Sequence, residues 1–179
     1  MTQTFFTSDT HFGHRRIIEL CLRPFSSVEE MDEALIANWN ARVSRGDRVF
    51  HLGDFAFVPS DPILDRLNGQ KILILGNHDY GDRVGTKWAG IHDMKHIRVE
   101  GIDLVLCHYA LRVWRASHRG AIHLYGHSHG NLPGDSRSLD VGVDAWGHRP
   151  VTLGEIRERL AMMPPRTEPD HHKERRDDR

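Results

Sequence analysis

At Lys71-Ile72-Leu73-Ile74-Leu75-Gly76-Asn77-His78-Asp79 an apolar run ends abruptly in a glycine and three polar side chains. Short apolar runs that stop at Gly or Asp are typical of buried strands. The polar residues would then lie in the loop that leaves the carboxyl end of the strand. In open α/β sheets this edge is where ligands bind. The stretch therefore predicts a buried strand that presents Asn77, His78 and Asp79 to a ligand site.

Four further apolar runs along the chain lead to a similar polar residue. The pairs of run and polar residue are 4–6 with Asp9, 48–52 with Asp54, 104–106 with His108 and 122–125 with His127. Five strands that each end in such a residue imply a single crevice at the carboxyl edge of a sheet. Positions that are distant in the sequence are therefore expected to converge on one site.

Helix signals stand where the connections between these strands should be. Ser27 precedes Glu30 by three residues, which is the spacing of a capping box. Asp61 is placed as an N-cap before Pro62, and Gly69 stands just past the end of that helix. The expected helices cover residues 15–23, 27–43, 61–68 and 152–162. With a late strand over the alternating Leu139, Val141 and Val143, the pattern predicts an α/β fold with a two-layered sheet core flanked by helices.

Length and composition limit the class of protein. A chain of 179 residues fits one domain, expected over residues 1–163, and the charged, proline-containing residues 164–179 are expected to form a disordered tail. A net charge of -1 excludes a broad basic surface for long nucleic acid, although a local patch could bind it. Two cysteines are too few for a disulfide framework.

The absence of a recognisable targeting or membrane-spanning segment in the sequence leads us to expect a cytoplasmic protein. No apolar stretch is long enough to span a bilayer. The first apolar run already leads to Asp9, which leaves no room for a removable signal peptide. We therefore expect no membrane partner, and the sequence carries no readable signal for an oligomeric state.

The polar residues at the strand ends are of types that bind metals. On extended backbone, the i, i+2 pairs Asp9/His11 and His127/His129 would each point both side chains the same way. Such ligands suit Mn, Fe, Zn, Ni or Co rather than calcium or thiolate-bound structural zinc. They exceed the four ligands of one tetrahedral ion and suit two divalent ions that share a carboxylate. The candidate ligands are Asp9, His11, Asp54, Asn77, His108, His127 and His129.

A centre of this kind favours anionic substrates. Two dications carry more positive charge than Asp9, Asp54 and a bridging hydroxide neutralise, and the remaining positive charge favours a phosphoryl group. The pattern therefore indicates a two-metal phosphoester hydrolase.

The motif series resembles a known family. Asp-x-His, Gly-Asp, Gly-Asn-His-Asp, His and Gly-His-x-His occur here in the order found in the calcineurin-like metallophosphoesterases, the superfamily that also holds purple acid phosphatases and repair nucleases. Residues 8–14 and 124–130 look like those of the compact bacterial and phage members. The likeness covers nearly the whole chain before the tail. It implies a four-layer αββα sandwich.

The resemblance also implies individual roles. One metal, for which manganese is the first expectation, would be held by Asp9, His11 and His129, the other by Asn77, His108 and His127, and Asp54 would bridge them. A metal-bound hydroxide would attack the phosphorus. His78 would bind the phosphate and protonate the leaving oxygen, and Asp79 would orient the His78 ring. His14 and Arg15, at the start of the helix over 15–23, are weaker candidates for substrate contact.

Other interpretations of single residues stay open. Asn77 and Asp79 also suit turns, and His108 could be a hydrogen-bonded core histidine. Residues 55–59 are a candidate apolar rim of the crevice. For Arg112, Arg115 and Arg119, an ordinary charged surface loop is preferred over a grip on a second phosphate.

The expected substrate is a phosphodiester or phosphomonoester, in a nucleotide or a short nucleic-acid end. The alternatives are a non-catalytic protein-binding scaffold, a metal store, or a nuclease that acts on longer nucleic acid.

Overall fold

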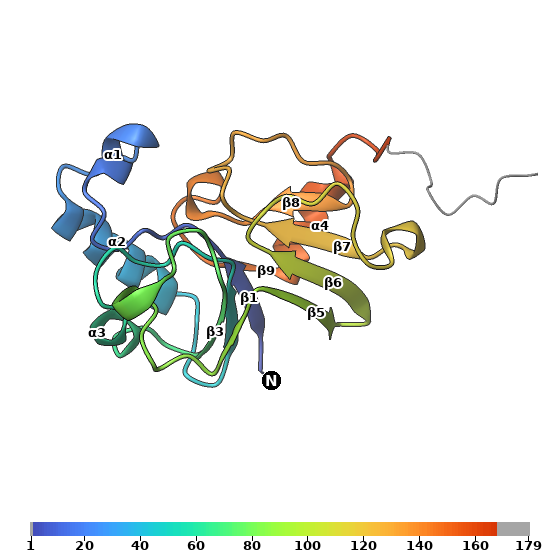
Figure 1. Cartoon of the computed structure of the whole chain (residues 1–179). Coiled ribbons are helices and arrows are strands. Elements are labelled where there is room, and N and C mark those ends of the chain that lie inside the picture. Colours follow the sequence, from blue (N-terminus) through green and yellow to red (C-terminus); the bar gives the residue numbers. More distant parts are fainter. Residues whose placement is uncertain (1, 168–179) are drawn as a thin grey trace, which may run out of the picture.

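The computed structural model of the chain describes residues 2–167, which form two β-sheets and four α-helices (Figure 1). Within this part of the chain, no helix is both long enough and apolar enough to cross a membrane. The strands are β1 (Thr4–Thr7), β2 (Arg48–His51), β3 (Gln70–Ile74), β4 (Gly90–His92), β5 (Met94–Val99), β6 (Ile102–Cys107), β7 (Ile122–Tyr125), β8 (Ser138–Asp140) and β9 (Val151–Thr152). The α-helices are α1 (Arg16–Leu20), α2 (Val28–Asn40), α3 (Asp61–Leu64) and α4 (Leu153–Ala161), and three 3-10 turns are η1 (Gly81–Arg83), η2 (Ser117–Arg119) and η3 (Val143–Ala145).

The first sheet has the strand order β4-β3-β2-β1-β9. β1 to β4 are parallel, and β9 runs antiparallel beside β1. Parallel neighbours need crossover connections, which α1 and α2 supply between β1 and β2 and α3 supplies between β2 and β3. The register aligns Thr7 with His51 and His51 with Leu73, so the three predicted strands are confirmed and end at one edge.

The second sheet has the order β5-β6-β7-β8. β5 is antiparallel to β6, and the other pairs are parallel. The predicted strands over 104–106 and 122–125 are confirmed as β6 and β7. The sequence did not single out β4 and β5, because β4 has three residues and β5 alternates between exposed and half-buried side chains.

The late strand is shorter than its alternating pattern predicted. β8 ends at Asp140, whose carboxylate accepts the Gly142 amide at 2.6 Å and so turns the chain. Val141 still donates to the Tyr125 carbonyl at 2.8 Å, but Val143 lies in η3. Val143 therefore fits the alternating pattern because its side chain is buried, not because it lies in a strand.

Alternate side chains of the first sheet enter two different cores. Phe5 packs in the cluster that includes Met31 and Trp39 of α2, whereas Phe6 packs in a cluster with Leu104 and Leu124 of the second sheet. Burial on both faces explains why these strands read as continuous apolar runs. The αββα sandwich is confirmed: Figure 1 shows α2 and α3 on one side of the paired sheets.

The layers around the second sheet are made differently. Leu153, Ile156 and Leu160 of α4 join the core between the sheets, where α4 contacts β9, β1 and β8. A separate small cluster holds Val105 of β6 with Trp114 and Ala121, which lie in the connection between β6 and β7. A loop with an aromatic side chain therefore takes part in covering the outer face of the second sheet.

The capping signals in the sequence predicted the first residues of two helices, α2 and α4. Ser27 Oγ accepts the Glu30 amide at 3.2 Å at the start of α2, and Thr152 and Glu155 form a capping box at the start of α4. The N-cap of α3 is Ser60 rather than Asp61, and α3 ends at Leu64, before the expected boundary at Gly69.

The first helix is also shorter than predicted. α1 ends at Leu20, and the next residues turn, with Leu22 at a φ of 51°. This turn sends the side chain of Arg23 inward instead of along a helix surface, where it donates to the carbonyl oxygens of Asp9 and Thr10.

The predicted tail divides into two parts. The Pro164 carbonyl accepts the Ser136 amide at 2.9 Å, and Arg166 pairs with Asp135 at 3.0 Å, so the first residues of the expected tail contact the body of the protein. The prediction of disorder for residues 168–179 lies outside the described residues.

Candidate metal centre

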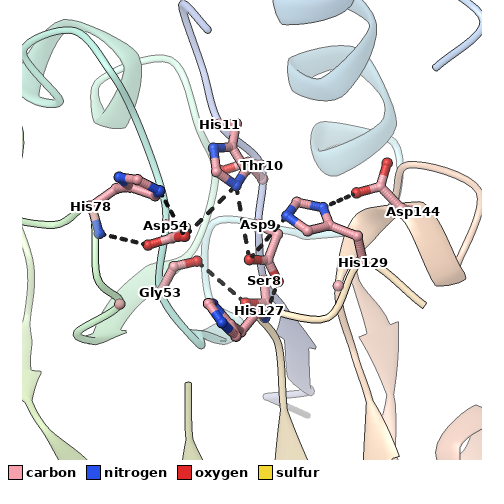
Figure 2. A network of polar contacts seen from close by, with 12 residues as sticks. Ser8, Asp9, Thr10, His11, Gly53, Asp54, His78, His127, His129 and Asp144 are labelled. Carbon is pink, nitrogen blue, oxygen red and sulfur yellow. Dashed lines mark hydrogen bonds and ion pairs between the residues drawn. The ribbon is translucent and has the colours of Figure 1, made fainter. Parts of the chain in front are cut away.

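The predicted ligands meet at the carboxyl edges of both sheets. Asp9, Asp54 and Asn77 follow β1, β2 and β3, and the histidines at 108, 127 and 129 follow β6 and β7. The Val143 amide donates to the Ser8 carbonyl at 3.0 Å, which ties the two edges together beside the site. Figure 2 shows His11, Asp54, His127 and His129 arranged around Asp9.

Asp9, His11 and His129 form one group of possible metal ligands, with one atom of each within 4.8 Å of the others. His11 Nε2 lies 3.9 Å from Asp9 Oδ1, and His129 Nε2 lies 4.0 Å from the same oxygen. Ligands at about 2.0 to 2.2 Å from a shared ion stand roughly 3 to 4 Å apart, so this group can surround one metal.

Asp54, His108 and His127 form a second such group. His108 Nε2 lies 3.5 Å from Asp54 Oδ2 and 3.1 Å from Asn77 Oδ1, which brings Asn77 to the same place. His108 Nδ1 lies 2.7 Å from the Leu52 carbonyl, so Nδ1 carries the proton and Nε2 keeps its lone pair for a cation.

Asp54, a member of the second group, also reaches the first. Its Oδ2 is 3.8 Å from His11 Nε2 and 3.5 Å from His108 Nε2, and its Oδ1 accepts the His78 amide at 2.9 Å. One carboxylate oxygen is thus within reach of both groups, while the other is held by the backbone (Figure 2).

The backbone at the ligands is not extended, which corrects the argument from i, i+2 spacing. Residues of both pairs and Asp54 adopt left-handed φ values, which for non-glycine residues cluster at functional sites. The angles are 57° at Asp9, 53° at His11, 56° at Asp54, 64° at His127 and 48° at His129. The side chains converge because tight left-handed turns aim them, not because a strand alternates.

Glycines make room for this convergence. A Cβ added at Gly126 would lie 2.4 Å from Asp9 Oδ2, and one at Gly76 would lie 2.3 Å from Asp54 Oδ1. The glycines of these two motifs therefore let backbone approach the acidic ligands closely.

The chemistry of the donors fits divalent cations. Within residues 2–167, neither Asp9 Oδ1 nor His11 Nε2 has a hydrogen-bond partner, although both atoms are buried. Burial raises the pKa of Asp9 well above its ordinary value and lowers the pKa of His11 far below its ordinary value. Buried polar atoms without partners are costly, and a metal that bound both would remove that cost.

A buried network behind the site holds His129 in place. His129 Nδ1 lies 2.7 Å from Asp144 Oδ2, and the Arg23 guanidinium pairs with both oxygens of Asp144 at 2.8 and 2.9 Å. Although burial raises the pKa of Asp144, the hydrogen bonds from His129 and Arg23 bring that pKa below its ordinary value. This network fixes the ring so that Nε2 faces Asp9.

Arg23 and Asp144 were missed by the sequence reasoning. Both stand outside the motifs, and Arg23 is the last residue of the helix predicted over residues 15–23. Asp140 was missed too, although its carboxylate accepts the Ser128 hydroxyl and the Gly130 amide and so shapes the loop that carries His127 and His129. No signal within a single motif would have found these long-range partners.

The structure uses Asp79 differently from the prediction. Asp79 Oδ2 accepts the amides of Asp54 at 2.7 Å and Gly76 at 2.9 Å, and its Oδ1 accepts the Phe55 amide at 3.0 Å. Among the contacts of the described residues, Asp79 joins the loops after β2 and β3 and does not orient the His78 ring. The predicted role fails because Asp79 is buried and both of its carboxylate oxygens face backbone donors inside the protein.

His78 lies at the solvent side of the centre. Its side chain is 39% exposed, and its Nε2 is 4.0 Å from Asp54 Oδ2. It is not a member of either ligand group. His78 is therefore placed where it could meet a ligand that enters from solvent beside the candidate metal ligands.

Of the two weaker substrate candidates, His14 contacts residues of the site. Its ring stacks on Phe57 at a centroid distance of 3.8 Å, and its Nδ1 is 3.4 Å from His11 Nδ1. Burial, followed by the neighbouring charges of His78 and Arg23, lowers the pKa of His14. Arg15 is an exposed N-cap of α1 without a side-chain cap, and the Gly13 amide, just before α1, donates to Asp32.

Within the candidate rim over residues 55–59, Phe57 contacts the site, whereas Phe55 and Ala56 are buried in the core. Besides His14, the Phe57 ring contacts His78 at 4.8 Å and His11 at 5.4 Å between centroids. The guanidinium of Arg83 lies over the same ring at 4.8 Å. An aromatic ring thus forms one wall of the site, and Arg83 joins it although no motif indicated this arginine.

Comparison with known proteins identifies a family. The family model of the calcineurin-like phosphoesterase superfamily domain matches residues 3–159. A protein of Methanocaldococcus jannaschii described as uncharacterised is 34% identical over 168 residues, covering 87% of this chain and 90% of that protein. The gene 66 protein of Mycobacterium phage L5 is 31% identical over 194 residues, covering 87% of this chain and 93% of that protein.

A solved structure shows the same fold. The protein of unknown function AQ665 from Aquifex aeolicus is similar with a TM-score of 0.72 and 24% sequence identity, covering 89% of this chain and 100% of that chain. The resemblance predicted from the motif series is therefore confirmed by a family model that spans almost all of the described residues. By its sequence, this chain belongs to the calcineurin-like phosphoesterase superfamily.

Proposed function

We propose that the chain is a hydrolase that depends on two metal ions and cleaves phosphodiester or phosphomonoester bonds of a nucleotide or a short nucleic-acid end. Membership of the superfamily supports a metal-dependent phosphoesterase with a phosphorylated substrate. The observation that carries the proposal is the place of Asp54 Oδ2, 3.8 Å from His11 Nε2 and 3.5 Å from His108 Nε2. A carboxylate within reach of two ligand groups suits a pair of ions.

The ligands divide between the two ions by proximity. Asp9, His11 and His129 would hold one ion, Asn77, His108 and His127 would hold the other, and Asp54 would contact both. We expect manganese first, although iron, zinc, nickel and cobalt suit the same donors. When bound, the ions would supply Lewis-acid activation of the phosphoryl group and of the attacking water.

His78 is the proposed general acid. Its amide is fixed on Asp54 Oδ1 at 2.9 Å, and its half-buried ring lies beside the metal ligands without belonging to them. An imidazolium there can bind the phosphate and give its proton to the leaving oxygen. Asp79 acts on this step as a positioning residue, because it holds the loops that carry Asp54 and His78.

The unpaired buried atoms favour an enzyme over a scaffold. A protein-binding module would gain nothing from Asp9 Oδ1 and His11 Nε2, which are buried without a partner among the described residues. A metal store would not need the non-ligand His78 at the mouth of the site. The scaffold does not account for the buried atoms of Asp9 and His11, and the metal store does not account for His78.

The test compares hydrolysis of bis-p-nitrophenyl phosphate with that of p-nitrophenyl phosphate by metal-stripped and manganese-loaded protein. His78→Ala should lower kcat and leave metal content nearly unchanged, because His78 is proposed to act on the phosphoryl group and belongs to neither ligand group. Asp54→Asn should lower both metal content and rate. The ester that is cleaved faster separates a phosphodiesterase from a phosphatase.

Two outcomes would contradict this assignment. Equal loss of metal in both variants would remove the distinct role of His78. Absence of hydrolysis of either ester with any of the five metals would contradict the enzyme.

A further inference from the structure

Arg83 is an arginine at the mouth of the metal centre with an unusual set of contacts. Its guanidinium lies over the ring of Phe57 at 4.8 Å and over the ring of Tyr80 at 5.2 Å. Phe57 in turn contacts His78 and His14. The arginine is therefore one aromatic ring away from the proposed general acid.

The arginine lacks the partners that similar arginines have. Two others in the described chain stack on aromatic rings, and each also has an oxygen acceptor. Arg159 lies over Trp146 and donates to the Ala145 carbonyl at 2.9 Å, and Arg166 lies over Trp114 and pairs with Asp135 at 3.0 Å. Among residues 2–167, the Arg83 guanidinium has ring contacts but neither an ion pair nor a hydrogen-bond acceptor.

The backbone beneath Arg83 is anchored. The buried Ser60 hydroxyl donates to the Arg83 carbonyl, and the buried Trp88 indole donates to the Val84 carbonyl at 2.6 Å. Two aromatic faces and a fixed backbone restrict the side chain, so little of its conformational freedom remains to be lost when an anion binds.

Stacking on aromatic rings leaves the N–H donors of the Arg83 guanidinium free to bind a ligand. A guanidinium that lies on aromatic faces keeps its N–H donors in its own plane, where they can bind two oxygens of a phosphate at once. The candidate metal ligands and His78 account for the scissile phosphoryl group. A further unpaired cation at the mouth is therefore suited to a second anion on the substrate.

We propose that Arg83, supported by Phe57 and Tyr80, forms a subsite for a second phosphate group of the substrate. The proposal rests on the phosphoesterase function proposed above and narrows its substrate class to esters that carry a phosphate near the one that is cleaved. A nucleoside diphosphate and the end of an oligonucleotide share this chemistry. Tyr80 is 59% exposed, which leaves the approach to Arg83 open.

The kinetic test uses two substrates that differ only in the second phosphate. They are thymidine 5′-(p-nitrophenyl phosphate) and the same compound with a 3′-phosphate, both hydrolysed by the full manganese-loaded chain. Arg83→Gln should lower kcat/KM about tenfold for the phosphorylated compound, mainly through KM, and less than about twofold for the other. Arg83→Lys, which keeps the charge without the planar fork, should show an intermediate loss.

Arg98→Gln is the matched control. Arg98 has a 67% exposed side chain on β5 and pairs in register with Asp103. Asp103 lies near the start of β6, whereas His108 follows the end of β6, so Arg98 is remote from the centre. This variant removes the same charge and should leave the preference for the second phosphate intact.

A binding experiment separates failure of the subsite from failure of the enzyme. Calorimetry with manganese present compares thymidine 5′-monophosphate, thymidine 5′-diphosphate and thymidine 3′,5′-bisphosphate on wild type and on the Arg83 and Arg98 variants. Tighter binding of a ligand with two phosphates, lost in Arg83→Gln and kept in Arg98→Gln, supports the subsite even if neither ester is hydrolysed. The better of the two ligands identifies a pyrophosphate chain or a nucleic-acid end.

Three results would overturn the subsite. One is an equal loss of kcat/KM on both substrates in Arg83→Gln, which would place Arg83 on the scissile phosphate or in the support of the site. Another is no loss on either substrate with unchanged binding of all three ligands. The last is an equal response of the Arg83 and Arg98 variants, which would reduce the effect to net charge.

Discussion

Asp79 shows how one buried carboxylate can support a site that it does not enter. Its oxygens accept the amides of Asp54, Phe55 and Gly76 at 2.7 to 3.0 Å. Two loops that each carry a proposed metal ligand are thereby held at a fixed separation. The loops would move apart if one of these acceptors were lost.

We predict that Asp79→Asn lowers the free energy of unfolding by about 2 kcal/mol, because the amide NH₂ would face a backbone N–H and leave it unsatisfied. Metal content and hydrolytic rate should fall together, unlike in His78→Ala, where the rate alone falls. Urea unfolding and metal analysis measure both effects. Asp82→Asn, on the exposed turn nearby, is the control, and an equal effect there would contradict the role of Asp79.

Single residues of the site differ in whether the sequence predicts their position. All seven ligand candidates converge, because each belongs to a motif that directly follows an apolar run. Arg23 and Asp144 did not stand out, since their pairing joins positions 121 residues apart and leaves no local pattern. Arg83 was missed for the same reason, because its position depends on the turn from Tyr80 and on contacts with Phe57.

At the scale of elements, α4 depends on one well-connected glutamate. Glu155 completes the capping box with Thr152 and pairs with Arg42 at 2.6 Å and Arg149 at 2.7 Å. Although partial burial raises the pKa of Glu155, the hydrogen bonds from Thr152 and Arg149 outweigh it and lower that pKa from 4.5 to about 2. The ionised carboxylate therefore favours the folded state.

We predict that the contribution of Glu155 to the free energy of unfolding is lost at low pH. Because the pKa of Glu155 is lower in the folded chain, its contribution is present above pH 4.5 and is lost as the pH falls towards about 2. Wild type should exceed Glu155→Gln in free energy of unfolding by about 1 kcal/mol at pH 7, after allowance for solvent exposure, and the difference should vanish in that window.

Denaturant unfolding at several pH values checks this, with the exposed Glu158→Gln on the same helix as the control. Glu158→Gln should change the free energy of unfolding by less than about 0.5 kcal/mol at pH 7. A Glu155→Gln difference that stays constant from neutral pH down to the acid limit would contradict the ionic origin of the effect.

Element boundaries followed the sequence where a cap was encoded and departed from it where tertiary contacts ended the element. Ser27 and Thr152 cap α2 and α4 as predicted. β8 stops at Asp140 because that carboxylate binds the loops around it, and α1 stops early because Arg23 turns inward. Neither contact is visible in hydrophobic periodicity.

At the scale of the whole molecule, the candidate centre joins the two sheets. Asp9, Asp54 and Asn77 follow strands of the first sheet, whereas His108 and His127 follow strands of the second. Ions held by both sets would stabilise the native state and not the unfolded chain. Metal should therefore strengthen the packing of one sheet against the other.

We predict that EDTA lowers the melting temperature of the manganese-loaded protein by about 5 to 10 °C, as expected for ligand near a hundredfold excess over its dissociation constant. Asp9→Asn should reduce the shift because it weakens one ligand group, whereas His96→Ala on β5 should keep it. Scanning calorimetry measures the shift, and an unchanged melting temperature after chelation would contradict a centre that joins the sheets.

The left-handed turns at the ligands have a consequence for design. Asp9, His11, Asp54, His127 and His129 occupy a backbone conformation that glycine adopts freely and other residues adopt at a cost of about 1 kcal/mol or more each. A search for stabilising substitutions that scored only the fold would favour glycine at these positions, and every such change would delete a donor. The candidate ligand positions therefore hold conformational strain that a stability search would remove, and an engineer who wants a more stable variant should look for gains outside these five residues.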